Sequence, residues 1–191
     1  KFNARIHTGI KGNYLAVAAG SGITPVLSII KHTLNSQPGS RFTLIYGNRD
    51  RNSIIFFEEL EGLKNKYMER FNFINILSRE KTDTDIFYGR INEEKLADLA
   101  KIVPYESFND IYLCGPEEMI FTSSTYFQQA GIKAENIHFE LFTTPGQKKS
   151  GTVVSESAEN TGPSSSVTIK LDGRSIDFKL GYNSNSLLDA A

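Results

Sequence analysis

The sequence has very little cysteine, and this absence excludes several classes of protein. Cys114 is the one cysteine among 191 residues. It cannot form a disulfide within the chain, and it cannot supply the several thiolates that an iron–sulfur or zinc–cysteine site needs. We therefore expect no metal site in these residues and a reducing, cytoplasmic location.

An excess of charge and long apolar runs are also missing. The chain carries 21 basic and 22 acidic residues, a net charge of -1, which creates no field suited to nucleic acid or an anionic membrane. No apolar run approaches the roughly 20 residues of a membrane helix. We expect neither partner. The first residues show no initiator Met and no signal peptide, so we expect a piece of a longer polypeptide.

What is present is an alternation of strand and helix patterns. Helical patterns at residues 24–34, 56–63, 92–100 and after Pro116 separate five expected strands, at residues 14–19, 41–46, 71–77, 110–114 and 137–142. Parallel neighbours need crossover connections. The pattern therefore predicts an α/β fold, a five-stranded, doubly wound parallel sheet with helices on both faces.

The composition changes after this region. Residues 145–166 are rich in Gly, Ser, Thr, Lys and Glu, which is typical of a flexible linker. Residues 167–171 and 175–180 then alternate around Asp172 and Gly173, which predicts a β-hairpin. We expect a first domain over residues 1–144, a linker over 145–166 and the start of a second domain over 167–191.

The first strand ends in a glycine turn, defined here as Gly20, Ser21, Gly22, Ile23, Thr24 and Pro25. Ligands of such sheets bind at the carboxyl ends of the strands, and helix N-termini bind anions. Glycines let a pyrophosphate approach the backbone, so a bulky residue at Gly22 should abolish binding. Thr24 is expected to cap the helix. The alternative is an ordinary tight turn.

Three arginines follow the second and third strands. Arg49, Arg79 and Arg90, with the hydroxyl of Ser78, would suit a dianionic 2′-phosphate if they converge. The alternative is that they are ordinary solvated arginines. Asp50 favours NADH instead, because an acidic residue near this strand end often binds an unphosphorylated ribose. The balance favours NADPH over NADH.

The fourth strand ends at Cys114, Gly115 and Pro116, where small groups leave room for a flat ring. The alternative for Cys114 is a buried small hydrophobe. The three histidines, His7, His32 and His138, show no spacing that marks a Cys–His catalytic pair.

Together these motifs resemble the pyridine-nucleotide domain of the ferredoxin-NADP reductase family over residues 13–142. The matching segments, in order, are residues 20–25, 45–49, 77–80, 89–91 and 114–119. The hairpin after the linker resembles the opening of a plant-type 2Fe-2S ferredoxin domain of β-grasp fold. Reductase components of bacterial oxygenases have this arrangement.

The resemblance implies roles for individual residues. The glycine turn would cradle the pyrophosphate, and Arg49, Ser78, Arg79 and Arg90 would hold the 2′-phosphate. Cys114 is the candidate catalytic residue, because it would border the nicotinamide with Gly115 and Pro116. Asn48 and Met119 complete the nucleotide set, and Glu140 and Phe142 would face the flavin.

The resemblance also implies partners. In this family NAD(P)H passes a hydride to FAD, which passes single electrons to a 2Fe-2S cluster and on to an oxygenase. No Arg-x-Tyr-Ser flavin motif occurs here, so we expect the FAD and ferredoxin modules elsewhere in the full chain. This piece alone should bind nucleotide and be inactive. The alternatives are the reductase of a ring-hydroxylating dioxygenase or other diiron oxygenase, and a non-redox nucleotide-binding module.

Overall fold

The computed structural model describes residues 11–141, 164–171 and 174–181. The chain divides into two compact units, Lys1–Gln147 and Lys148–Ala191. Each unit is considered by itself. The domain boundaries expected above, at residues 144 and 166, stay predictions.

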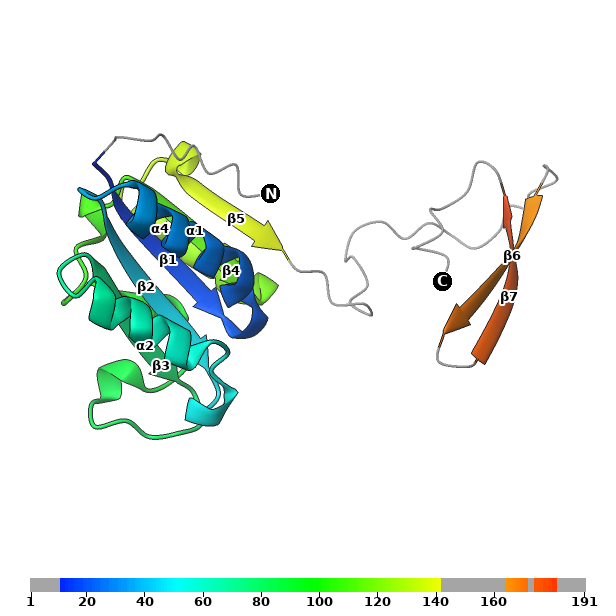
Figure 1. Ribbon diagram of the computed structural model, residues 1–191, viewed down its shortest axis with the longest axis horizontal. Helices are drawn as coiled ribbons and strands as arrows, with labels where there is room; N and C mark the ends of the chain where they lie inside the picture. Colours follow the sequence, from blue (N-terminus) through cyan, green and yellow to red (C-terminus); the bar gives the residue numbers. More distant parts are fainter. Residues whose placement is uncertain (1–10, 142–163, 172–173, 182–191) are drawn as a thin grey trace. The chain divides into compact units, whose positions relative to one another are not determined.

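The first unit contains the five-stranded parallel sheet that the sequence predicts. The order across the sheet is β3-β2-β1-β4-β5, and Figure 1 shows the arrowheads pointing the same way. The strands are β1 (Asn13–Ala19), β2 (Arg41–Asn48), β3 (Phe71–Leu77), β4 (Asp110–Gly115) and β5 (Ile137–Leu141). The α/β fold class is therefore confirmed.

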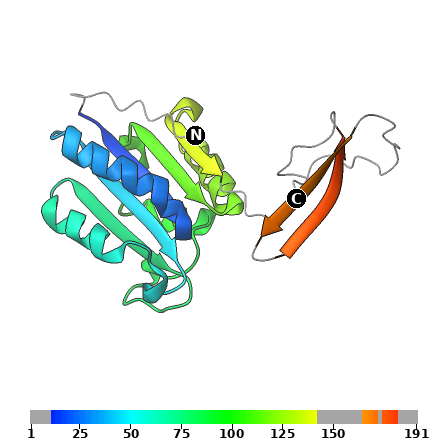
Figure 2. The same ribbon diagram turned by 45° about the vertical axis from the view of Figure 1, so that its right-hand side comes forward.

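Helices cover both faces of this sheet. One apolar cluster joins the sheet to α1 (Ile23–Ser36) and α2 (Phe57–Lys66), and a second joins it to α3 (Glu93–Leu99) and α4 (Glu117–Gln129). Figure 2 shows α1 and α2 side by side on one face of the sheet. The alternation of strand side chains explains the two clusters: Ala16 and Ala18 belong to the first, Leu15 and Val17 to the second.

Two helix starts differ from the sequence prediction. A single 3-10 turn, η1 (Gly20–Gly22), follows β1, so α1 begins at Ile23 with Gly22 as its N-cap. Thr24 therefore lies inside the first helical turn and is not the cap. Its hydroxyl donates a hydrogen bond of 3.0 Å to the Ser21 carbonyl oxygen. The sequence around Pro116 is typical of a proline in the first turn of a helix, whereas Pro116 is the N-cap of α4 and lies just before it.

The helix expected over residues 56–63 begins one residue later, at Phe57. Phe56 precedes α2, has a left-handed backbone (φ 59°) and is 43% exposed, while Leu60 fills the core. The chain reverses at Phe56, which directs its ring outward. The prediction for Asn92 is confirmed, because its side chain accepts a hydrogen bond of 2.9 Å from the Lys95 N–H and caps α3.

The second unit contains two strands, β6 (Ser164–Leu171) and β7 (Arg174–Gly181), which pair antiparallel. The strand begins at Ser164, so the last three residues of the expected linker belong to it. The rest of that linker and the turn at residues 172–173 lie outside the described residues. The assignment of this unit to a ferredoxin domain stays a prediction.

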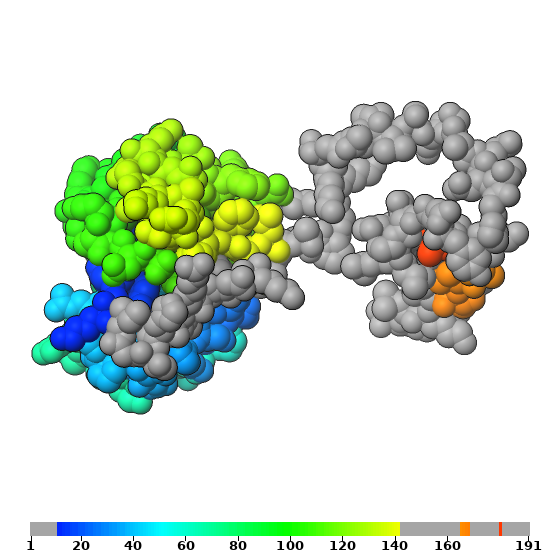
Figure 3. All heavy atoms as spheres, turned by 90° about the horizontal axis from the view of Figure 1, so that it is seen from above, coloured from blue at the N-terminus to red at the C-terminus, as the bar shows by residue number. Residues whose placement is uncertain are grey.

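Strand β5 forms one edge of the large sheet and exposes an aromatic pair. Within the described residues, β5 pairs only with β4. Phe139 of β5 and Phe121 of α4 meet edge to face with ring centroids 6.2 Å apart, and both are more than 40% exposed. Figure 3 shows the adjoining surfaces of α4 and β5 in green and yellow.

Candidate functional site

The loops after β1 and β4 meet where the strand order reverses. Strand β1 lies between β2 and β4, and this reversal is where open α/β sheets bind ligands. Gly22 packs directly on the end of β4: a Cβ atom there would overlap the Cys114 carbonyl oxygen and lie 2.9 Å from the Gly115 nitrogen. Contact between the two loops therefore requires a glycine at position 22, whereas the sequence suggested space for a pyrophosphate.

Gly20 is the glycine with open space beside it. Its backbone is left-handed (φ 53°), and an added Cβ atom would meet nothing within 4 Å. The left-handed conformation favours glycine, and the open side leaves the backbone accessible to a ligand. Ser21 and Thr24 are exposed beside it, and Ile23 is buried beneath. The glycine turn can therefore receive an anion at Gly20.

The carboxyl ends of β2 and β3 bring the three arginines together. The Ser78 N–H donates to the Asn48 carbonyl oxygen (2.9 Å) and the Arg79 N–H to that of Arg49 (2.8 Å). The two strands thus stay side by side beyond their ends. On the far side of β3, the Gly89 N–H donates to the Leu77 carbonyl oxygen at 2.9 Å.

We define the arginine cluster as Arg49, Arg79 and Arg90. The bond from Gly89 holds the chain next to Arg90 against the end of β3. All three arginines are exposed, and none of them takes part in an ion pair among the described residues. Their guanidinium groups are therefore available to a phosphate.

The Asp50 carboxylate has a local partner. Its Oδ1 accepts a hydrogen bond of 2.9 Å from the Ser53 N–H, and the Ser53 hydroxyl lies 3.1 Å from the Asp50 N–H. This reciprocal cap stabilises the turn η2 (Arg51–Ser53). Asp50 thus serves the backbone of its own loop, which weakens the objection that it raised to a 2′-phosphate.

Asn48 contributes a buried polar group at the end of β2. The residue is 9% exposed, and its Nδ2 has no hydrogen-bond partner among the described residues. A buried donor without a partner costs free energy. An acceptor on a bound nucleotide would remove that cost. The orphaned donor, the open side of Gly20 and the free arginines together fit an anionic dinucleotide.

The Cys114 side chain is a buried small hydrophobe, as the alternative interpretation held. It is 0% exposed and packs in the cluster beneath α1. Burial, with the charge of Glu140 as a smaller contribution, raises the pKa of the thiol to about 11. The thiol therefore stays protonated near neutral pH and is no nucleophile. The backbone of Cys114 and Gly115, rather than the sulfur, lies against the glycine turn.

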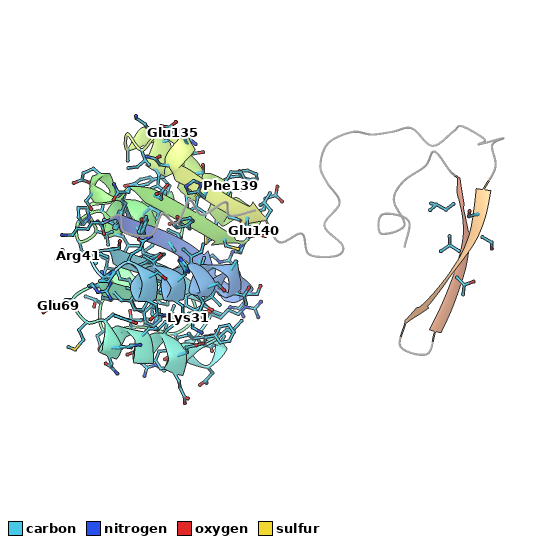
Figure 4. The ribbon with its side chains drawn as sticks, turned by 45° about the horizontal axis from the view of Figure 1, so that its top comes forward. Lys31, Arg41, Glu69, Glu135, Phe139 and Glu140 are labelled. Carbon is cyan, nitrogen blue, oxygen red and sulfur yellow. The ribbon has the colours of Figure 1, made fainter. Side chains whose placement is uncertain are left out.

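The remaining predicted site residues surround this point. Met119 is buried, and its Cε lies 2.8 Å from where a Gly115 Cβ would be, so it supports the loop from below. Pro116 is exposed at the head of α4. Glu140 is half-buried opposite Cys114 in the β4–β5 register, and Figure 4 shows it near the carboxyl end of β5. Phe142 lies outside the described residues.

Sequence reasoning missed three residues at this edge. Tyr46 is fully buried, and its hydroxyl donates to the Gly20 carbonyl oxygen at 2.8 Å. Tyr88 bridges to Leu77 and exposes 37% of its surface beside Arg90. Lys95 is buried under this loop and donates from Nζ to the Asp85 carbonyl oxygen at 2.9 Å. Tyr88 could have been found as an aromatic residue within two positions of Arg90; no sequence signal marks the others.

The glycine turn lies apart from two hollows in the first unit. Two hollows of about 440 and 610 Å³ lie elsewhere, one beside the amino ends of the strands and one along β3. Neither is lined by a residue of the glycine turn. Among the described residues, no helix has both the length and the apolar character to cross a membrane.

Comparison with known proteins agrees with this geometry. Residues 16–125 match the family described as "Oxidoreductase NAD-binding domain", so the chain belongs to that family. The domain is of the ferredoxin-reductase type, as its motifs suggested.

Among named relatives, the chain is 41% identical over 182 residues to one subunit of the 1,2-phenylacetyl-CoA epoxidase of Escherichia coli K12. The match covers 95% of this chain and 50% of that protein. It is also 33% identical to the ferredoxin reductase component of the 3-ketosteroid-9-alpha-monooxygenase of Rhodococcus rhodochrous, over 84% of this chain and 43% of that protein. The chain thus spans about half the length of the curated relatives it matches.

Solved structures show the same fold. The cytochrome P450 reductase GcoB of Amycolatopsis superposes with a TM-score of 0.60 at 22% identity, over 70% of this chain and 38% of that one. The CS-b5R domains of human Ncb5or, in their NAD+ form, superpose with a TM-score of 0.59 at 23% identity, over 68% of this chain and 36% of that one.

Proposed function

We propose that this chain binds NADPH and orients its nicotinamide for hydride transfer to a flavin. The observation that carries the proposal is the joint placement of the open glycine turn and the arginine cluster at the carboxyl edge of one sheet. Backbone N–H groups and guanidinium groups are the two kinds of donor that a pyrophosphate and a 2′-phosphate need.

Each group of residues binds a different part of the nucleotide. The glycine turn holds the pyrophosphate, with the open side of Gly20 against it. The arginine cluster and Ser78 hold the 2′-phosphate, and the exposed ring of Tyr88 offers a surface on which adenine stacks. Asn48 donates its unpartnered Nδ2 to the nucleotide. The backbone of Cys114, Gly115 and Pro116, supported by Met119, borders the nicotinamide.

A bound nicotinamide supplies the hydride, and the chain's own residues keep it in place. The neutral thiol of Cys114 adds no charge beside the ring, because its raised pKa keeps it protonated. Glu140 and Phe142 are the residues that we propose for contact with the flavin.

We further propose the place of this chain in a larger reductase of the cytoplasm. The names of the relatives, part of an epoxidase and a monooxygenase reductase component, support electron transfer to an oxygenase. In this proposal FAD and a 2Fe-2S cluster are bound by other modules of the full protein, and the substrate of the oxygenase is phenylacetyl-CoA. The single cysteine of this chain cannot hold such a cluster.

The preference for NADPH can be tested by calorimetric titration. We expect NADP+ to bind about tenfold or more tightly than NAD+, and Arg79→Ala to remove most of that ratio. Arg41→Ala is the matched control, because Arg41 is also exposed but lies at the amino end of β2, far from Glu140 in Figure 4. The ratio should shrink with added salt, since these charges are exposed.

The outcomes separate the parts of the proposal. Equal affinities for NADP+ and NAD+ in the parent would contradict the assignment of the arginine cluster to a 2′-phosphate. Absence of binding by either dinucleotide would contradict the function itself. A loss in Arg41→Ala equal to that in Arg79→Ala would mean that charge in general, rather than this cluster, attracts the ligand.

A further inference from the structure

The Tyr46 hydroxyl joins two parts of the candidate site. Tyr46 lies in β2, the strand that leads to Arg49, and its side chain is 0% exposed. It donates a hydrogen bond of 2.8 Å to the carbonyl oxygen of Gly20, which lies 26 residues earlier in the glycine turn. This contact ties the turn after β1 to the strand that carries the arginine cluster.

Other groups face the same hydroxyl. Burial raises the pKa of Tyr46 to about 12, while the Asn48 side chain and the Ile55 backbone act in the opposite direction. Asn48 is the last residue of β2, and Ile55 lies in the loop that follows it. The hydroxyl is therefore neutral near pH 7, and its proton is donated to Gly20.

The direction of the Gly20 carbonyl determines the direction of the next N–H. No peptide bond among the described residues is cis, and a trans peptide is planar with its C=O and N–H pointing opposite ways. The Gly20 carbonyl points inward to the buried Tyr46. The Ser21 N–H of the same peptide therefore points outward, to the exposed side of the turn.

Two donors hold the carbonyl oxygen of this peptide, the Ile23 N–H and the Tyr46 hydroxyl. Glycine reorients easily because it has no side chain. The Ile23 N–H is shared between the carbonyl oxygens of Gly20 and Ser21, so only part of this hydrogen bond is directed to Gly20. The Tyr46 hydroxyl donates to the Gly20 carbonyl oxygen from a neighbouring strand.

We infer that Tyr46 is a positioning residue for the dinucleotide, whose hydroxyl holds the Gly20–Ser21 peptide so that the Ser21 N–H faces the pyrophosphate. The inference rests on the proposed function. Without the hydroxyl, the peptide can rotate and present its carbonyl oxygen to the phosphate, which repels it.

The test compares Tyr46→Phe with Tyr105→Phe. Tyr105 is also buried and donates to a backbone carbonyl oxygen, that of Leu96 at 3.0 Å, but it belongs to the apolar cluster on the other face of the sheet. Each variant loses one buried O–H···O=C bond. Calorimetry with NADP+ and NAD+ should show binding weakened about three- to tenfold by Tyr46→Phe and less than twofold by Tyr105→Phe.

An NMR measurement reports on the peptide itself. In the ¹⁵N-labelled parent and in Tyr105→Phe, the dinucleotide should shift the Ser21 amide resonance, whereas in Tyr46→Phe this shift should be lost. If Tyr46→Phe does not fold, the parent protein still tests the inference. A Ser21 amide resonance that does not shift in the parent at saturating dinucleotide overturns it. Equal binding by the parent and Tyr46→Phe overturns the inference but leaves the proposed function standing. If the parent binds neither dinucleotide, both the inference and the proposed function are contradicted.

Discussion

Gly20 and Gly22 lie two residues apart, yet alanine should affect them in different ways. At Gly22 the new methyl group overlaps the Cys114 carbonyl oxygen, so the loops after β1 and β4 must move apart. Overpacking of this kind costs about 3 kcal/mol of unfolding free energy. At Gly20 the methyl group meets nothing within 4 Å, and the cost is the left-handed backbone, about 1 kcal/mol.

Nucleotide affinity should follow the reverse order once folding is accounted for. The open side of Gly20 is where the pyrophosphate approaches, so a methyl group there should weaken binding about tenfold in the folded protein. Gly20→Asn is the matched control for backbone strain, because asparagine tolerates the left-handed region better than alanine does. It should recover stability and still bind weakly.

Urea denaturation and calorimetric titration on the same samples measure both quantities. Unchanged urea midpoints for Gly22→Ala would refute the close contact between Gly22 and the end of β4. Parent-like affinity in Gly20→Ala would refute the placement of the ligand at its open side. Gly22→Val, the substitution that the sequence alone suggests, tests neither point, because unfolding and loss of binding would coincide.

Two further predictions concern buried groups near the site. The Cys114 thiol should resist alkylation at pH 8 until urea unfolds the chain. The folded pKa of about 11 lies above the usual cysteine pKa, so the free energy of unfolding should fall as the pH rises from the usual value towards 11. The fall should be smaller in Cys114→Ala, which lacks the thiol. Equal pH profiles for the two proteins would contradict the burial argument. Lys95→Met should speed amide exchange around Asp85 and lower the NADP+ over NAD+ ratio about threefold, since Nζ holds this loop. Recovery of slow amide exchange and of the NADP+ over NAD+ ratio in Lys95→Arg would support this role for the cation. Unchanged amide exchange in Lys95→Met would exclude it.

Hydrophobic periodicity was sufficient to predict the sheet and its helices. The apolar run of β1 and the helical spacing of Val26, Ile30 and Leu34 place the turn between them within a residue or two. Patterns of this kind report burial, which is the dominant force in the fold. They do not report local backbone geometry, so the 3-10 turn at Gly20 and the left-handed Phe56 were not predicted.

The chemistry of the site depended on contacts that spacing does not encode. Sequence spacing allowed Asp50 to face a ribose or its own loop, and the structure shows its carboxylate bound to the Ser53 N–H of that loop. Cys114 could have lined an open crevice, but the packing of α1 buries it. The bond from Tyr46 to Gly20 spans 26 residues and joins two strands, so no local pattern reveals it. Motif order predicts a site at the carboxyl edge of the sheet, and side-chain direction had to come from the structure.

The exposed aromatic pair on the β5 edge has a practical consequence for handling the isolated chain. A strand edge without a neighbour among the described residues, flanked by Phe121, Phe139 and the exposed Leu141, invites edge-to-edge pairing between molecules. Concentrated samples should therefore self-associate, and light scattering across a dilution series would detect it. Replacing Phe139 with lysine should keep such samples monodisperse while leaving the nucleotide edge of the sheet intact.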